Sequence, residues 1–179
     1  MNRSRLALSL SVISVFAFGA VAQAKLSSAG GAAVEFHAVG PVGLKITGKS
    51  SVVQVDSDDK NVTVTVPLAN LDTGMSLRNT HMKDKYLETA KYPNAVLVVP
   101  KAGAGYPNGG SGNAQGNLTL HGVTKPVTFH YDVKKEGAEF AVRGTVHINM
   151  NDYKIEQPSF AGATVKPDVD VDISFRAKE

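Results

Sequence analysis

Hydrophobic and polar residues alternate along most of the chain from Ala33 onward. Every second side chain of a strand points to the same face of its sheet, so this alternation predicts strands with one apolar and one polar face. The clearest runs cover residues 33–37, 62–68, 127–133, 140–148 and 169–176, and shorter runs cover 44–47, 52–55, 95–99 and 117–120.

Eight or nine strands with short turns and one buried face are typical of an antiparallel barrel or sandwich. We therefore expect a mainly β fold, in one domain, with no internal repeat. Residues 136–137 are expected to form a tight hairpin. That turn would place Tyr131 opposite Val142 on the inner face, and His130 opposite Arg143 on the outer face.

Two segments lack the alternation. Residues 76–88 are predicted to form one short helix, inserted between strands as a lid or plug, because Met75, Met82 and Tyr86 have spacings that share a helix face. Ser76 is expected to cap its start. Residues 102–116 contain six glycines and are expected to form a flexible loop, without the lysine that a phosphate-binding loop needs.

The composition narrows the chemistry. The chain has 179 residues and no cysteine, which excludes disulfides, thiolate catalysis and cysteine-ligated metals. Residues 1–24 combine a basic start, an apolar run and Ala22-Gln23-Ala24, the pattern of a cleavable signal peptide. We therefore expect export, with residues 25–179 as the mature domain and no stable membrane anchor.

Removing residues 1–24 takes two arginines and no acid, which leaves 17 of the 19 basic residues against 16 acidic ones. That balance gives no electrostatic argument for nucleic acid as a partner.

No spacing of residues predicts a metal or catalytic site. The histidines lack an HxH or HExxH pattern, and three aspartates on one straight strand cannot converge on a single Ca²⁺. Ser76, His81 and Asp84 lack a nucleophile elbow, so serine catalysis is disfavoured. The histidines are His37, His81, His121, His130 and His147, and the strand aspartates are Asp168, Asp170 and Asp172.

The inward set of side chains is large, apolar and almost free of ionisable groups. A closed barrel lined in this way holds either its own side chains or one apolar guest. The alternation alone leaves both arrangements open.

Several motifs resemble the YceI-like family. They are Leu71-Asp72-Thr73-Gly74, Leu77-Arg78-Asn79-Thr80-His81-Met82, Lys91-Tyr92-Pro93, Gly116 to Val127, Asp152-Tyr153-Lys154-Ile155 and Val169 to Ile173. The likeness spans about Ala33 to Arg176. Two residues depart from the family pattern: Asn79 stands where an aspartate is common, and Lys154 stands where glycine usually follows the tyrosine.

The resemblance implies an extended lipocalin-like antiparallel barrel in the periplasm. It also implies a long isoprenoid or other amphiphilic lipid in the lumen, such as a polyprenyl chain or a quinone-like molecule. On this hypothesis the protein is a non-catalytic lipid-binding or carrier protein, for carriage, storage or stress response, with no cofactor other than the lipid.

The residues expected to line the lumen are the large members of the inward set. Arg78 and His81 are candidates for the polar head group, and further apolar residues lie near the helix. The lumen candidates are Phe36, Leu44, Ile46, Leu97, Leu118, Phe129, Tyr131, Phe140, Val142, Val146 and Phe175, and those near the helix are Leu77, Met82, Tyr86 and Leu87.

Two other functions remain open. One is an enzyme acting on a hydrophobic substrate with His81 or His121 as acid–base, which requires a polar cluster inside the barrel. The other is a stress-related structural protein with a filled barrel. An exposed strand edge or the barrel mouth offers a surface for a homodimer.

Overall fold

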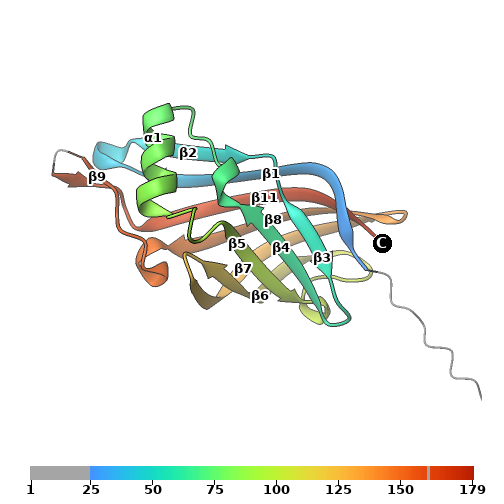
Figure 1. The fold of residues 1–179 in the computed structure, drawn as a ribbon. Coiled ribbons are helices and arrows are strands. Elements are labelled where there is room, and N and C mark those ends of the chain that lie inside the picture. The colour runs from blue at the N-terminus through green and yellow to red at the C-terminus, as the bar shows by residue number, and fades with distance from the viewer. Residues whose placement is uncertain (1–24, 161) are drawn as a thin grey trace, which may run out of the picture.

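The computed structural model describes residues 25–160 and 162–179, so the predicted signal peptide lies outside the described residues. Eight antiparallel strands follow one another in the order β11-β8-β7-β6-β5-β4-β3-β1, and pairing of β1 with β11 closes them into a barrel (Figure 1). The ninth strand, β2, pairs with β1 outside this ring. The predicted fold, a closed antiparallel barrel with one short helix, is confirmed.

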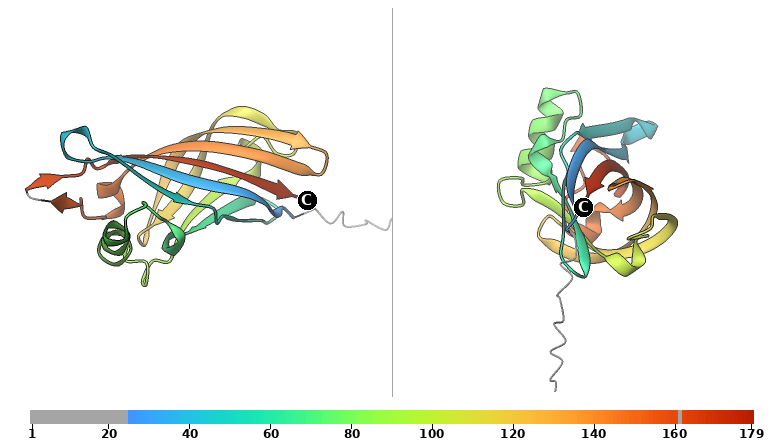
Figure 2. Two further views of the ribbon diagram at one scale, coloured as in Figure 1. Left: turned by 90° about the horizontal axis from the view of Figure 1, so that it is seen from above. Right: turned by 90° about the vertical axis from the view of Figure 1, so that its right-hand side faces the viewer.

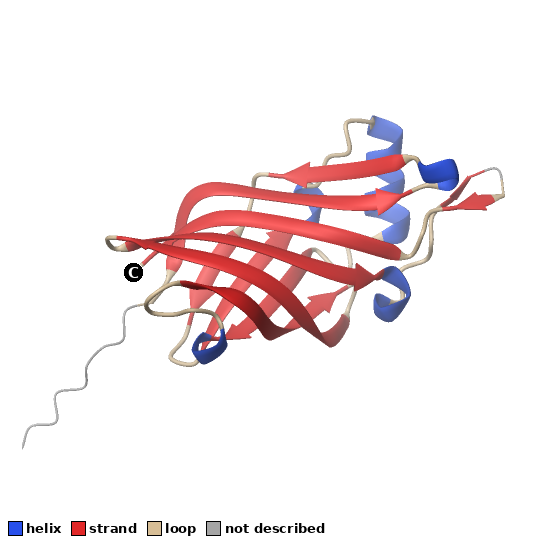
Figure 3. Cartoon of the chain, turned by 180° about the vertical axis from the view of Figure 1, so that it is seen from behind, coloured by secondary structure: helices blue, strands red, loops and turns tan. Residues whose placement is uncertain are grey.

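Strands that are neighbours in the sheet mostly follow one another along the chain. Three long strands, β7, β8 and β11, form one wall of the barrel (Figure 3). The strands are β1 (Ser27–Val39), β2 (Lys45–Ser50), β3 (Gln54–Ser57), β4 (Asn61–Pro67), β5 (Asn94–Pro100), β6 (Gly110–Leu120), β7 (Val123–Glu136), β8 (Glu139–Asn149) and β11 (Asp168–Lys178), with a small hairpin β9 (Ser159–Phe160) and β10 (Ala163–Thr164). The helical elements are η1 (Pro41–Gly43), η2 (Leu68–Asn70), α1 (Ser76–Thr80), η3 (His81–Tyr86), η4 (Lys101–Gly103) and η5 (Met150–Tyr153).

The hairpin between β7 and β8 turns one residue later than expected. Glu136 pairs with Glu139, so the two-residue loop is Gly137-Ala138, and Gly137 has φ +67°. This left-handed conformation suits glycine. The predicted pairs are therefore wrong, because Tyr131 faces Gly144 and Arg143 faces Asp132. The pairing register differs from the predicted one by two residues, which keeps Tyr131 on the inner face.

The glycine-rich segment is shorter as a loop than predicted. The connection ends at Gly109, and Gly110–Leu120 forms β6, which pairs along its whole length with β7. The pairing of β6 with β5 is limited to residues 96–98 and 117–119. Gly116 shows why this strand carries small residues, since a Cβ there would lie 2.9 Å from the carbonyl oxygen of Val98.

The predicted helix is present as α1 followed directly by the π-helical turn η3, and it ends at Tyr86. Met75 occupies the N-cap position without a side-chain hydrogen bond, so the expected cap by Ser76 is wrong. The helix lies against the outside of the barrel at one end (Figures 1 and 2). Met82 and Tyr86 pack on the core, whereas Met75 is exposed.

The buried core consists of two clusters. One lies at the helix end and contains Tyr153, with Met82 and Tyr86 of the helix packed against it. The other contains Phe140 and Phe175 of the long strands and lies toward the chain termini. Val171 of β11 packs against both clusters. The two clusters thus extend toward opposite ends of the barrel and meet at Val171.

Candidate ligand-binding site

One row of cross-strand partners crosses five strands in the middle of the barrel and continues onto β2, outside the ring. Its members are cross-strand partners, so they share the inner face of the sheet. Four large members of the row retain accessible surface and are only half-buried. The row is Gly48, Phe36, Val171, Val146, Phe129 and Ala114, and Phe36, Val171, Val146 and Phe129 are the half-buried members.

Phe129 and Val146 pack against neither of the two buried clusters. They are partners across β7 and β8. The middle of the barrel is therefore lined by apolar side chains that the core clusters cover only in part.

Most expected lumen residues lie on this inner face. Phe140 and Phe175 are buried in the core, and Met82, Tyr86 and Leu87 reach the core from the helix side. Cross-strand partners place Leu97 with Leu118 and Val142 with Phe175, and Ile46 packs on the helix-end cluster. Tyr131 faces inward beside Gly112 and Gly144.

Leu44 and Leu77 are different. Leu44 lies in the β1–β2 connection, beyond the closed barrel, and is 57% exposed. Leu77 lies on α1 and is 67% exposed. The expectation that Leu44 lines the lumen is therefore wrong, because its hairpin extends past the ring of strands.

Two lysines lie near the ends of the barrel. Lys125 shares the inner face with Leu118, and its partly exposed ammonium donates to Asp152 at 2.7 Å. Lys101 is only 6% exposed, and its ammonium lies 4.8 Å from the ring centre of Tyr106. Lys125 lies close to one end of β7, and Lys101 follows the last residue of β5, so the middle of the barrel stays apolar.

Arg78 carries a buried hydrogen-bond donor without a partner. Its Nη2 donates to the carbonyl oxygen of Thr73 at 2.6 Å, while its Nε is buried and unpaired among the described residues. Asn79, the departure from the family pattern, accepts from the Thr73 hydroxyl and donates to Asp72 instead. A backbone carbonyl, rather than residue 79, thus orients Arg78.

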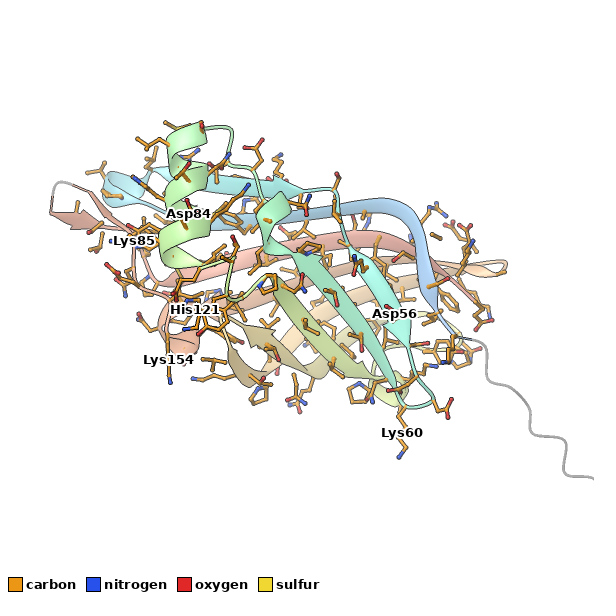
Figure 4. The ribbon with its side chains drawn as sticks, in the orientation of Figure 1. Asp56, Lys60, Asp84, Lys85, His121 and Lys154 are labelled. Carbon is orange, nitrogen blue, oxygen red and sulfur yellow. The ribbon has the colours of Figure 1, made fainter. Side chains whose placement is uncertain are left out.

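His81 and His121, the acid–base candidates, are in different environments. His81 is exposed. His121 is nearly buried, with Nε2 2.7 Å from Glu88 Oε2 and Nδ1 3.1 Å from the carbonyl oxygen of Tyr153 (Figure 4). Tyr92 packs on it edge-on, with ring centres 4.6 Å apart. Both ring nitrogens face acceptors, which leaves neither free for a substrate.

The outer face carries the aspartates of β11. Asp168, Asp170 and Asp172 are exposed and accept hydrogen bonds from Asn149, His147 and Thr145, respectively. The hydrogen bond that His147 donates to Asp170, with the charges of Asp170 and Asp168, raises the pKa of His147. In the described part of the chain, no three His, Asp or Glu side chains gather closely enough to hold a metal ion.

A hollow of about 420 Å³ adjoins this outer face, near the base of β2. It is lined by His37, His147, Ile46 and Lys166, among others.

No helix within residues 25–160 and 162–179 is long and apolar enough to cross a membrane.

A closed eight-stranded antiparallel barrel with an apolar inner face and a helix packed against its outside at one end defines the class of small lipocalin-like β-barrels. The chain belongs to the YceI-like domain family, whose profile matches residues 23–177.

Known proteins agree with this assignment. UPF0312 proteins from Pseudomonas savastanoi pv. phaseolicola and Pseudomonas syringae pv. syringae are each 32% identical over 121 residues, which is 64% of this chain and 60% of theirs. A polyisoprenoid binding domain from Saccharophagus degradans, implicated in plant cell wall breakdown, has a similar fold, with a TM-score of 0.73, 22% identity, and coverage of 86% of this chain and 97% of that one. Burkholderia cenocepacia BcnA gives a TM-score of 0.61 at 20% identity over 80% of this chain and 95% of its own.

Proposed function

We propose that this protein is an exported, non-catalytic carrier of a long isoprenoid or other amphiphilic lipid. The observation that supports this most is the row of half-buried apolar side chains inside the closed barrel, including Phe129 and Val146. The polyisoprenoid binding described for the Saccharophagus domain, which has the same fold, points to the same ligand class.

The energetics favour an apolar chain as the occupant. Each buried CH₂ contributes about 0.8 kcal/mol, so one five-carbon isoprene unit contributes up to about 4 kcal/mol before ordering costs. Micromolar affinity needs about 8 kcal/mol, so a few units suffice. The polar head group then mainly sets the orientation of the lipid.

Arg78 is the proposed partner of that head group. Its unpaired, buried Nε can donate a hydrogen bond, and a guanidinium suits an anionic group or a quinone-like carbonyl. His81, one turn further along the helix and exposed, is proposed as a second contact.

Export to the periplasm is part of the proposal and rests on residues 1–24. Cell fractionation with N-terminal sequencing of the mature protein tests it. We expect a periplasmic protein that starts at Lys25. A cytoplasmic protein that keeps residues 1–24 would contradict export without affecting the lipid-binding proposal.

Native mass spectrometry followed by lipid extraction tests the binding function. We expect protein from its own host to carry a prenyl lipid or quinone, and the stripped protein to take up decaprenyl phosphate. Val146→Trp should block uptake because residue 146 shares the inner face of the barrel with Phe129. Thr145→Trp is the matched control, since the next residue faces outward.

Two results would refute this function. One is stripped protein that takes up none of the prenyl lipids, although its fold is intact by circular dichroism. The other is equal uptake by the two tryptophan variants, which would place any bound lipid outside the barrel. Replacing Arg78 by Gln is expected to weaken binding of decaprenyl phosphate more than binding of decaprenol, about tenfold by loss of a charge-assisted hydrogen bond.

A further inference from the structure

The tip of the β1–β2 hairpin presents apolar side chains to solvent. Val42 is fully exposed, at 106% of its reference surface, and Leu44 is 57% exposed. Val42 also has φ +50°, a conformation that is unfavourable for a β-branched residue. The position therefore combines a strained backbone with an exposed valine, a combination that folding alone does not favour.

Lysines surround the base of this tip. Residues 38–50 contain Lys45 and Lys49 and no acidic residue. Lys166 joins them, since its backbone N–H donates to the carbonyl oxygen of Val39 at 2.8 Å. Lys49 pairs with Glu35, whereas Lys45 and Lys166 form no ion pair within the described part of the chain. Asp168 and Asp170 line the same hollow as Lys45 and Lys166. The hairpin thus has an apolar tip, and its base carries these two lysines beside two aspartates.

A second exposed apolar pair lies at the same end of the molecule. Met75 and Leu77, at the start of the helix, are 56% and 67% exposed. With Val42 and Leu44 they are the large hydrophobic residues that are exposed among those the structure describes. The hairpin tip, the β9–β10 hairpin and the helix lie at the same end of the barrel, where the β9–β10 hairpin extends furthest, while the C-terminus and the start of β1 lie at the opposite end (Figures 1 and 2).

We infer that the hairpin tip and the start of the helix form a docking surface for an anionic phospholipid bilayer. Val42 and Leu44 insert among the acyl chains, Lys45 and Lys166 contact lipid phosphates, and Met75 and Leu77 add a second apolar contact. Apolar side chains flanked by unpaired cations are the pattern of interfacial membrane binding, because each lysine near an anionic surface adds to the attraction.

This inference goes beyond lipid carriage, because it concerns the outer surface and does not require an occupied barrel. A bilayer is the expected partner because the exposed apolar residues lie on two separate elements, the hairpin tip and the start of the helix. A flat, fluid surface can contact both elements at once. Lys45 and Lys166 complement the lipid phosphates.

Vesicle sedimentation of the delipidated mature chain tests the inference. We expect the protein to sediment with vesicles of phosphatidylcholine and phosphatidylglycerol, and to do so less with phosphatidylcholine alone. The double variant V42D/L44D should lower the partition coefficient more than tenfold, and M75D/L77D by a smaller factor. Lys45→Gln should lower it about fivefold and reduce its dependence on salt.

Lys134→Gln is the matched control. This exposed lysine lies near the β7–β8 turn, at the other end of the barrel, and its loss should change binding little. Circular dichroism of each variant checks that the fold is intact.

Three outcomes would overturn the inference: no sedimentation of the wild-type chain with anionic vesicles, unchanged sedimentation of V42D/L44D, or a wild-type dimer that this double variant dissociates. The last result would assign the surface to a second copy of the chain. None of these outcomes affects the test of the carrier function, which measures uptake of decaprenyl phosphate by the wild type and by Val146→Trp. The two proposals are therefore tested independently.

Discussion

The side chains of His121 and Glu88 meet at 2.7 Å, although 33 residues separate them. Both residues have left-handed backbones, with φ +50° and +44°. His121 forms the turn between β6 and β7, and Glu88 follows the helix, while the other imidazole nitrogen bonds the backbone of Tyr153 in η5. One side chain therefore ties three segments together at the helix end of the barrel.

This contact should stabilise the fold measurably. A double-mutant cycle with His121→Gln and Glu88→Gln is expected to give a coupling free energy of about 1–2 kcal/mol, reduced from the buried limit because Glu88 is partly exposed. The exposed pair Lys125 and Asp152 is the control and should couple by less than about 0.5 kcal/mol. Equal coupling in the two cycles would contradict a special role for His121.

Replacing Lys154 by glycine should stabilise the fold. Lys154 ends η5 with φ +57° and ψ +28°, the left-handed conformation that glycine adopts without strain. This geometry explains why glycine is the usual family residue at this position. Chemical denaturation is expected to show Lys154→Gly more stable by about 0.5–1 kcal/mol and Lys154→Ala unchanged or less stable. Equal stability of the two variants would show that the backbone at residue 154 is not strained.

Restoring the family aspartate at position 79 should destabilise this protein. The Asn79 amide donates to Asp72 at 2.6 Å, and this bond is the main reason that the pKa of Asp72 is lowered. A lowered carboxyl pKa stabilises the folded state above the unfolded pKa, and this contribution is lost as the pH falls through the folded pKa. Asn79→Asp replaces the donor by a second carboxylate, so the melting temperature should drop at neutral pH.

Two further measurements check this account of Asn79. The deficit of Asn79→Asp should shrink in acid, where one of the two carboxyls takes up a proton. Adding Asp72→Asn should restore the melting temperature at neutral pH. A variant as stable as the wild type at neutral pH would show that the two side chains separate freely.

Gly48 leaves room for the ring of Phe36. A Cβ at position 48 would lie 2.2 Å from Cε1 of Phe36, so Gly48→Ala must displace the ring. We expect a loss of about 1–3 kcal/mol in the free energy of unfolding. The double variant with Phe36→Val should lose less than the sum of the two single variants. Additive losses would exclude this contact as the cause.

His147 should make stability depend on pH. Its pKa is raised, chiefly by the hydrogen bond to Asp170, so its contribution to stability is complete below the unfolded pKa, about 6.5, and is lost as the pH rises through the folded pKa. An NMR titration of Asp170→Asn should show the His147 pKa lowered toward its ordinary value. Asp172→Asn is the control, because Asp172 bonds Thr145 instead. A similar shift in both variants would point to general charge effects.

Local alternation predicted the faces of β7, β8 and β11, because each of these strands has water on one side and the core on the other. It failed for β6, whose glycines carry no side chains to show a period. That strand forms because β7 supplies its hydrogen-bond partners. The close approach of Val98 to Gly116 then keeps its residues small.

The site was less predictable than the fold. Whether a barrel is hollow depends on its radius, which is set by strand number and stagger rather than by any single segment. The bond between His121 and Glu88 joins residues that no local pattern connects, and the only signal for it was a histidine before Gly122 at a turn. The buried Nε of Arg78 depends likewise on how the helix is seated.

The barrel closes by joining its first strand to its last, with Ser27 beside Lys178. The closing seam therefore cannot form until β11 has been synthesised, and contacts of such long sequence separation favour slow folding. Deleting β11 would therefore open the barrel between β1 and β8 rather than only shorten the chain. Fusion partners attached at Lys25 or Glu179 would emerge together, away from the hairpin tip, so tethering or labelling there leaves the opposite end accessible.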